Sequence, residues 1–231
     1  MKIRALLPRI WRVEADSLHD LGLAFVRAQE YSDGARYYRK IFELEDFARD
    51  WKRIHQVDTF DYLDRWNGYN LRGEIYLRWL KEVEASSALM PLEGSLRDAL
   101  LSVGSLQEIE HGYLFGVCDD EGPAEKELVT RHEIAHAFFA LDERYRQKAN
   151  AAVKNLPRDY LVLAEACLCE KGYHPRVFID EIQAYLATGD LEHGVLGLRT
   201  LRVPLKRMDA ALCLADHFEA TFARWRQSAS I

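Results

Sequence analysis

The sequence predicts an α+β protein that is predominantly α-helical, with a small sheet preceding a long central helix and a helical region at the N-terminus. Two observations carry this prediction. Residues 125–155 contain neither Pro nor Gly and hold many apolar side chains, which is typical of a long, largely buried helix. Residues 113–117 are rich in β-formers and precede an acidic turn at residues 119–123, so they predict a strand that leads into that helix.

Residues 1–103 are expected to form the N-terminal helical region. Turn-forming residues at 32–34 and 66–70 divide it, and Pro91 to Gly94 separate a last short helix from the rest. The expected helices span residues 16–31, 35–54, 72–84 and 95–101. Aromatic residues are dense in this region, and most of them are expected in the core, with a few left to line a substrate groove.

Residues 104–231 are expected to complete one compact chain. The best strand candidates lie within residues 106–117, and the long helix follows them. Pro157 and Pro175 suit the first turns of two further helices, which Gly172 and Gly189 then end. These helices are expected at residues 157–170 and 176–188, and a last amphipathic helix at residues 205–225.

Composition excludes several classes of protein. With 231 residues, 48% hydrophobic and 29% charged, the chain is typical of a globular domain with a substantial core. A net charge of −6 argues against a nucleic-acid partner, so basic pairs such as Lys206-Arg207 are expected on solvated faces. The chain has no apolar run long enough for a transmembrane segment, and Pro8 and Arg9 interrupt the one near its start. We therefore expect a cytoplasmic protein, and secretion by an unconventional signal stays open.

The four cysteines are expected to be reduced core thiols. Cys167 and Cys169 are separated by one residue, which is the spacing of neither a zinc knuckle nor a thioredoxin-type motif. Two residues apart on a helix, they face different directions. Cys118 and Cys213 lie in apolar segments far from that pair.

The most informative motif is His132-Glu133-Ile134-Ala135-His136, inside the long predicted helix. Residues four apart lie on one helix face, so both imidazoles can reach one metal ion, and Glu133, about 100° round the axis, can reach a water on it. A hydrogen-bonded core histidine is the ordinary alternative. Two His and a Glu buried without partners would cost several kcal/mol in total, which favours a metal site.

A catalytic zinc ion needs a third protein ligand. Asp142 is a weak candidate, because in a continuing helix it lies about 240° round the axis from His136. Glu181, on a later helix, and Glu165 and Glu170, on the next one, are the remaining carboxylates. We favour Glu181, because Gly172 and Pro175 leave its helix free to fold back. The isolated histidines are expected to be bystanders, and they are His111, His174 and His193.

The motif and the downstream carboxylate resemble the gluzincin group of zinc metallopeptidases over residues 113–186. This resemblance implies a zincin-like catalytic core at residues 104–231, with His132, His136 and Glu181 as Zn²⁺ ligands and Glu133 as general base. It also implies that the strand at residues 113–117 is an edge strand that pairs with an extended peptide substrate.

Thermolysin-like members carry an Asp four residues after the ligand Glu, and this chain has Tyr185 there. The spacing keeps Tyr185 on the face of Glu181, where its hydroxyl would stabilise the oxyanion; ordinary core packing is the alternative. The acceptor that orients each His ligand is expected to be Asp180, Asp142 or a backbone carbonyl.

The expected function is that of a zinc-dependent peptide hydrolase. Two alternatives stay open, a metal-dependent hydrolase of a non-peptide amide or ester and a non-catalytic helical binding module. A ferritin-like carboxylate site is disfavoured, because Glu170 and His174 miss the Glu-x-x-His spacing. Residues 1–103 match no family, and the oligomeric state is open.

Overall fold

The structure is a computed structural model that describes residues 1–34, 36–118, 122–189, 194–197, 201 and 209–229. The chain forms two compact units, residues 1–129 and residues 130–231, and each unit is described by itself. The coarse prediction is confirmed, because the protein is mainly helical with one small mixed sheet.

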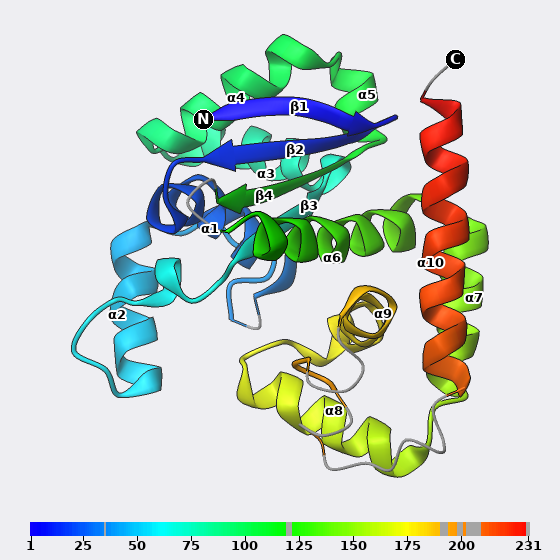
Figure 1. The fold of residues 1–231 in the computed structure, drawn as a ribbon. Helices are drawn as coiled ribbons and strands as arrows, with labels where there is room; N and C mark the ends of the chain where they lie inside the picture. The colour runs from blue at the N-terminus through cyan, green and yellow to red at the C-terminus, as the bar shows by residue number, and fades with distance from the viewer. Residues whose placement is uncertain (35, 119–121, 190–193, 198–200, 202–208, 230–231) are drawn as a thin grey trace. The chain divides into compact units, whose positions relative to one another are not determined.

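The first unit contains a four-stranded sheet in the order β1-β2-β4-β3 (Figure 1). Strands β1 (Lys2–Leu7) and β2 (Ile10–Ala15) form an antiparallel hairpin. Strand β4 (Tyr113–Cys118) pairs parallel with β2 and antiparallel with β3 (Gly68–Arg72). The helical prediction for residues 1–103 is wrong in part, because strands β1, β2 and β3 lie within that region. They are five or six residues long, too short for a clear periodic signal.

Strand β4 is an interior strand, so the prediction that it is an edge strand is wrong. Its backbone groups are already paired on both sides, by β2 and by β3, and all six of its residues are buried. A strand in this position has no free backbone groups for an extended peptide. The peptide-pairing role expected for residues 113–117 is therefore excluded.

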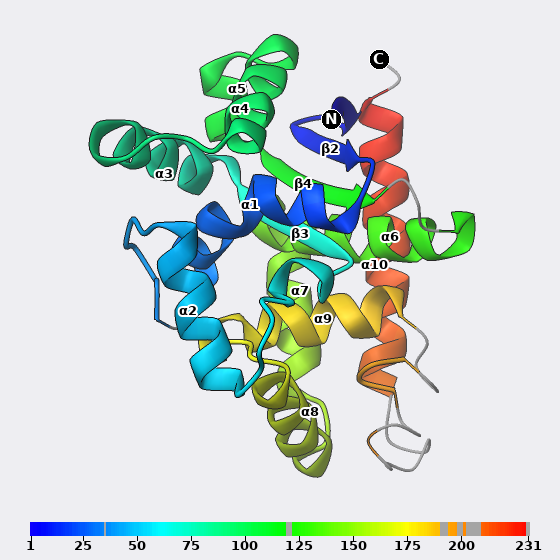
Figure 2. The same cartoon turned by 90° about the vertical axis from the view of Figure 1, so that its left-hand side faces the viewer.

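Among the described residues, five α-helices lie wholly within the first unit, and three of them make the main helical contacts with the sheet. The five helices are α1 (Leu18–Asp33), α2 (Leu44–His55), α3 (Gly73–Ser86), α4 (Pro91–Val103) and α5 (Leu106–Glu110). Helix α1 contacts β2, β3 and β4, and Figure 2 shows it beside β3 and β4. The predicted helix over residues 35–54 begins only at Leu44, the predicted loop at 66–70 enters β3, and part of the strand region at 106–117 is α5.

Helix α6 (Pro123–Leu141) runs from the first unit into the second. The second unit continues with α7 (Glu143–Lys154), α8 (Arg158–Glu170), the short 3₁₀ helix η2 (Pro175–Val177), α9 (Phe178–Thr188) and α10 (Asp209–Ser228). Helix α10 packs against α7 and α9, which also contact one another. These interfaces bury the apolar side chains of the second unit, among them Phe138, Ile182 and Phe218.

The long helix predicted over residues 125–155 is interrupted at Asp142, so that prediction is wrong in its continuity. Asp142 has extended backbone angles and its carboxylate accepts the backbone N–H of Tyr145 at 3.0 Å, which makes it the N-cap of α7. An Asp is a good N-cap, and it ends one helix and starts the next without Gly or Pro. Trp225 also donates to Asp142, at 3.1 Å, so both oxygens of this carboxylate accept structural hydrogen bonds.

None of the four cysteines, all of which the structure describes, forms a disulfide, as predicted. Only Cys118 is fully buried; Cys169 and Cys213 are exposed, so the expectation of core thiols is wrong for those two.

Among the residues that the structure describes, no helix has both the length and the apolar character needed to cross a membrane. The predicted turn at residues 119–121, His193, Lys206-Arg207 and the start of the predicted last helix lie outside the described residues.

Candidate metal centre

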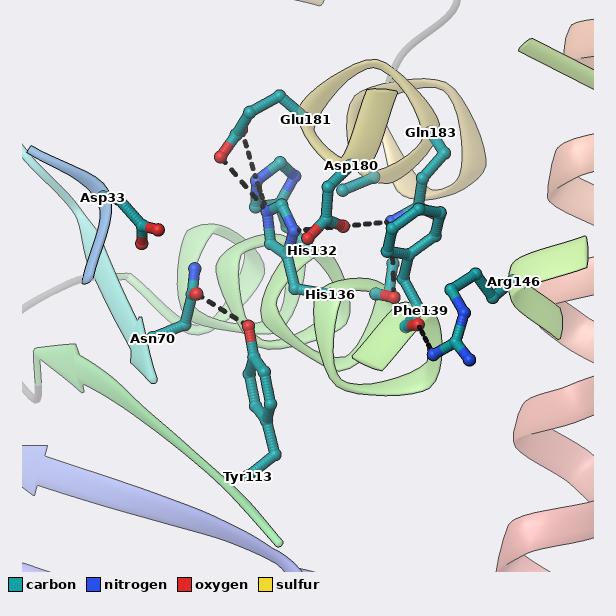
Figure 3. Close-up of polar contacts among 12 residues, drawn as sticks. Asp33, Asn70, Tyr113, His132, His136, Phe139, Arg146, Asp180, Glu181 and Gln183 are labelled. Atoms are coloured by element: carbon teal, nitrogen blue, oxygen red, sulfur yellow. Dashed lines mark hydrogen bonds and ion pairs between the residues drawn. The ribbon is translucent and has the colours of Figure 1, made fainter. Parts of the chain in front are cut away.

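His132, His136 and Glu181 come together in the second unit (Figure 3). The two histidines lie one turn apart on α6, and their Nε2 atoms are 3.1 Å from each other. Helix α9 brings the Glu181 carboxylate to the same place, with Oε1 3.6 Å from Nε2 of His136 and Oε2 3.8 Å from Nε2 of His132. Three potential ligand atoms thus face one point from two helices.

The spacing of these atoms fits a small divalent cation. Ligands about 2.0–2.1 Å from a tetrahedral zinc ion stand about 3.3 Å from one another. The two Nε2 atoms are 3.1 Å apart, and the nearest Glu181 oxygen lies 3.6 Å from His136 (Oε1) and 3.8 Å from His132 (Oε2), so these distances bracket that value. Two imidazole nitrogens and one carboxylate oxygen are also the donor set of a class of catalytic zinc sites that keep one position open. The residues present therefore fit zinc in number, chemistry and separation.

Asp180 orients His136 for this role. Nδ1–H of His136 donates to Oδ1 of Asp180 at 2.8 Å, so when the ring is neutral its lone pair is on Nε2, the atom that faces His132 and Glu181 (Figure 3). Of the three acceptors considered from the sequence, the structure places Asp180 against His136. A carboxylate behind a ligand histidine fixes its tautomer and raises its basicity.

Asp180 is itself held by a buried hydrogen-bond chain. The side-chain amide of Gln183 donates to Oδ1 of Asp180 at 3.0 Å and lies 3.3 Å from the backbone carbonyl of Ala135, on the motif helix. The hydroxyl of Tyr145, on α7, donates to Oε1 of Gln183 at 2.7 Å. Side chains from α7 and α9 therefore lock the position of one imidazole on α6. Gln183 lies three residues after Asp180 on α9, a spacing that could have revealed it from the sequence.

The two imidazoles differ in their affinity for protons. Burial by itself lowers the pKa of His136, but the carboxylates of Asp180 and Glu181 raise it to about 10. Burial and the positive charge of His136 hold the pKa of His132 well below its usual value. The pair therefore shares one proton in the absence of a cation, and a divalent cation in the same place would replace it.

Glu133 is almost fully buried, at 4% exposure, on the turn of α6 that carries both histidines. Its negative charge contributes to raising the pKa of His136, Tyr173 and Tyr185, which shows that its carboxylate acts on the same small volume. A buried carboxylate next to a candidate metal ligand is placed to accept a proton.

Two tyrosines lie beside the histidines. The ring of Tyr185 is 4.5 Å from the ring of His132, and its hydroxyl is 3.4 Å from the hydroxyl of Tyr173. Burial, with the nearby charge of Glu181, raises the pKa of both phenols, so both keep their protons at neutral pH and can donate them in hydrogen bonds. Tyr173 was not found from the sequence, because it lies in a turn after Gly172 and has no periodic relation to the histidines.

The competing candidates lie elsewhere. Glu165 and Glu170 are exposed on α8 and do not belong to the cluster. Asp142 is the N-cap of α7. His174 is the N-cap of η2, and its Nδ1 accepts the backbone N–H of Arg176 at 3.2 Å. His111 is exposed at the end of α5.

Comparison with protein-family models, with curated proteins and with solved structures finds no match for this chain.

Proposed function

We propose that the protein is a zinc-dependent hydrolase of peptide bonds, with His132, His136 and Glu181 as the zinc ligands. The observation that supports this most is that the Glu181 carboxylate, 45 positions beyond His136 in the chain, lies 3.6 and 3.8 Å from the two Nε2 atoms, while Asp180 accepts a hydrogen bond from the other ring nitrogen of His136. A binding module with an accidental motif would have no need of the Glu181 carboxylate beside the two histidines. The gluzincin resemblance stays a prediction.

Zinc in such a site lowers the pKa of a bound water and polarises the substrate carbonyl. The chain supplies the proton chemistry. Glu133 takes the proton of the attacking water and passes it to the nitrogen that leaves as the amine, so the carboxylate is regenerated in each cycle. Burial of Glu133 keeps bulk water away from this proton.

Tyr185 is the residue that we assign to the developing oxyanion. Its hydroxyl stays protonated at neutral pH, and its ring rests on the His132 imidazole, which fixes the direction of the phenol. Tyr173 lies within reach of the same hydroxyl and helps to orient it. A preorganised hydroxyl of this kind stabilises the charge that forms on the carbonyl oxygen.

The test is turnover of a fluorogenic peptide library by zinc-loaded protein and by the Glu133→Gln variant. Glu133→Gln should retain zinc and lose at least about a hundredfold in kcat, the effect of removing a general base. Glu165→Gln, a matched change on the exposed face of α8, should leave kcat unchanged. Equal turnover by the wild type and Glu133→Gln would contradict the proposal, and cleavage of amides or esters but of no peptide would move it to the non-peptide alternative.

A further inference from the structure

A small pocket lies between α7 and α10, with a volume of about 70 Å³. This is several times the roughly 10–15 Å³ that holds one water molecule, so a small ion fits. Helix α7 lines it with Arg144, Tyr145 and Lys148, and α10 lines it with His217, Thr221 and Arg224. Ala220 of α10 completes the lining, and four of these seven residues carry basic side chains.

The helical spacing explains why the basic groups converge. Arg144 and Lys148 are four residues apart on α7, and His217 and Arg224 are seven residues apart on α10, so each pair lies on one face of its helix. The two helices pack against each other along their length, and these faces meet at the pocket.

The positive charge in the pocket is only partly compensated. Arg224 is paired with Asp142. Among the residues that the structure describes, the side chains of Arg144 and Lys148 form no ion pair or hydrogen bond. Like charges one turn apart destabilise a helix by a few tenths of a kcal/mol, and the chain as a whole is acidic, with a net charge of −6. An anion in the pocket would remove that repulsion.

The pKa of the His217 imidazole is affected by the same positive charges. Burial lowers its pKa, and the charges of Lys148 and Arg144 lower it further, against the opposing effect of Asp216. Tyr145 contributes its ring to the wall, but its hydroxyl is already donated to Gln183. The cationic groups and the hydroxyl of Thr221 are therefore the donors available to a ligand here.

We infer that the pocket between α7 and α10 is a binding site for a phosphate-class anion, with Arg144 and Lys148 as its principal donors. Guanidinium and ammonium groups form short, charge-assisted hydrogen bonds to phosphate oxygens, and Arg can do so with two parallel bonds. The volume of about 70 Å³ is large enough for one phosphate group. The site does not depend on the proposed hydrolase activity.

The test is calorimetric titration of the full chain with inorganic phosphate, after chelation so that no metal ion can bind the phosphate. Arg144→Ala and Lys148→Ala should each weaken binding about tenfold, the effect of losing one charge-assisted hydrogen bond. Arg158→Ala and Lys154→Ala are matched controls, because both residues are exposed in the same unit and neither lines the pocket. A parallel titration with O-phosphoserine distinguishes a free anion from a phosphate ester, according to which binds more tightly.

All four substituted residues are exposed, so the variants should fold, and circular dichroism checks this. Absence of phosphate binding by the wild type at millimolar concentration would overturn the inference. So would equal affinity in the wild type, Arg144→Ala and Lys148→Ala.

Discussion

Replacing Asp180 tests how the candidate metal centre is held together. Oδ1 of Asp180 accepts two hydrogen bonds, from Nδ1–H of His136 at 2.8 Å and from the Gln183 amide at 3.0 Å. Asp180→Asn keeps an oxygen for both donors and removes the negative charge. Asp180→Ala removes the acceptor as well, so His136 loses the group that fixes its tautomer.

The magnitude follows from these two losses. Removing the partner of a ligand histidine typically weakens metal binding by about 10- to 100-fold, which is about 1.4–2.7 kcal/mol. Asp180→Asn should lie near the lower end, because the hydrogen-bond geometry survives. Asp180→Ala should lie near the upper end, because the buried N–H of His136 is left without an acceptor.

The assay is competition for Zn²⁺ between the metal-free protein and a chromophoric chelator at neutral pH. Asp216→Asn, an exposed carboxylate on α10, serves as the control for a general loss of negative charge and should bind zinc as the wild type does. If folded Asp180→Asn and Asp180→Ala both keep the wild-type affinity, Asp180 does not orient His136 toward a metal ion, and the reasoning is refuted.

Three further predictions concern stability. Tyr145→Phe leaves the buried Oε1 of Gln183 without its donor and should lower the free energy of unfolding by about 1–3 kcal/mol; an unchanged thermal midpoint would contradict this. Burial raises the pKa of Glu30 from 4.5 to about 7, so the folded state holds this proton more tightly, and between these pH values stability falls as pH rises. The free energy of unfolding should fall by about 3 kcal/mol over this pH range, and urea titrations at several pH values would measure it. Glu30→Gln should not show this fall. If the free energy of unfolding depends on pH equally in both proteins, the prediction is refuted. Glu93→Ala removes the buried carboxylate that pairs with Arg27, leaving the guanidinium with two backbone carbonyls and the more distant Glu43, and should cost about 3 kcal/mol; a loss below 1 kcal/mol by urea denaturation would be inconsistent with the buried pair.

Much of the candidate site could be predicted from the sequence, because it depends on local geometry. The four-residue spacing of His132 and His136 places both rings on one face of any helix. Glu181 required only that a later helix fold back, which the turn at Gly172 and Pro175 permits. Tyr145 and Tyr173 were missed because their places follow from tertiary packing of α7 and of a turn, which no spacing in the sequence encodes.

The fold was predicted less completely than the site. Charged and apolar residues alternate over only four positions in β1 and five in β2, and β3 begins at a Gly in a segment with the composition of a loop. These segments become strands because they pair with distant segments of the chain, so their local sequence is not enough to predict them. The interior position of β4 is a property of the sheet order and is likewise invisible in its own residues.

Anomalous scattering at the zinc absorption edge tests the central claim most directly. Crystals of zinc-loaded protein should show one strong peak about 2.0–2.2 Å from Nε2 of His132, Nε2 of His136 and a carboxylate oxygen of Glu181. The peak should be lost in Glu181→Ala and retained in Glu133→Gln. A site with no peak in the wild type, or a zinc ion bound elsewhere with Glu181 turned away, would contradict the account.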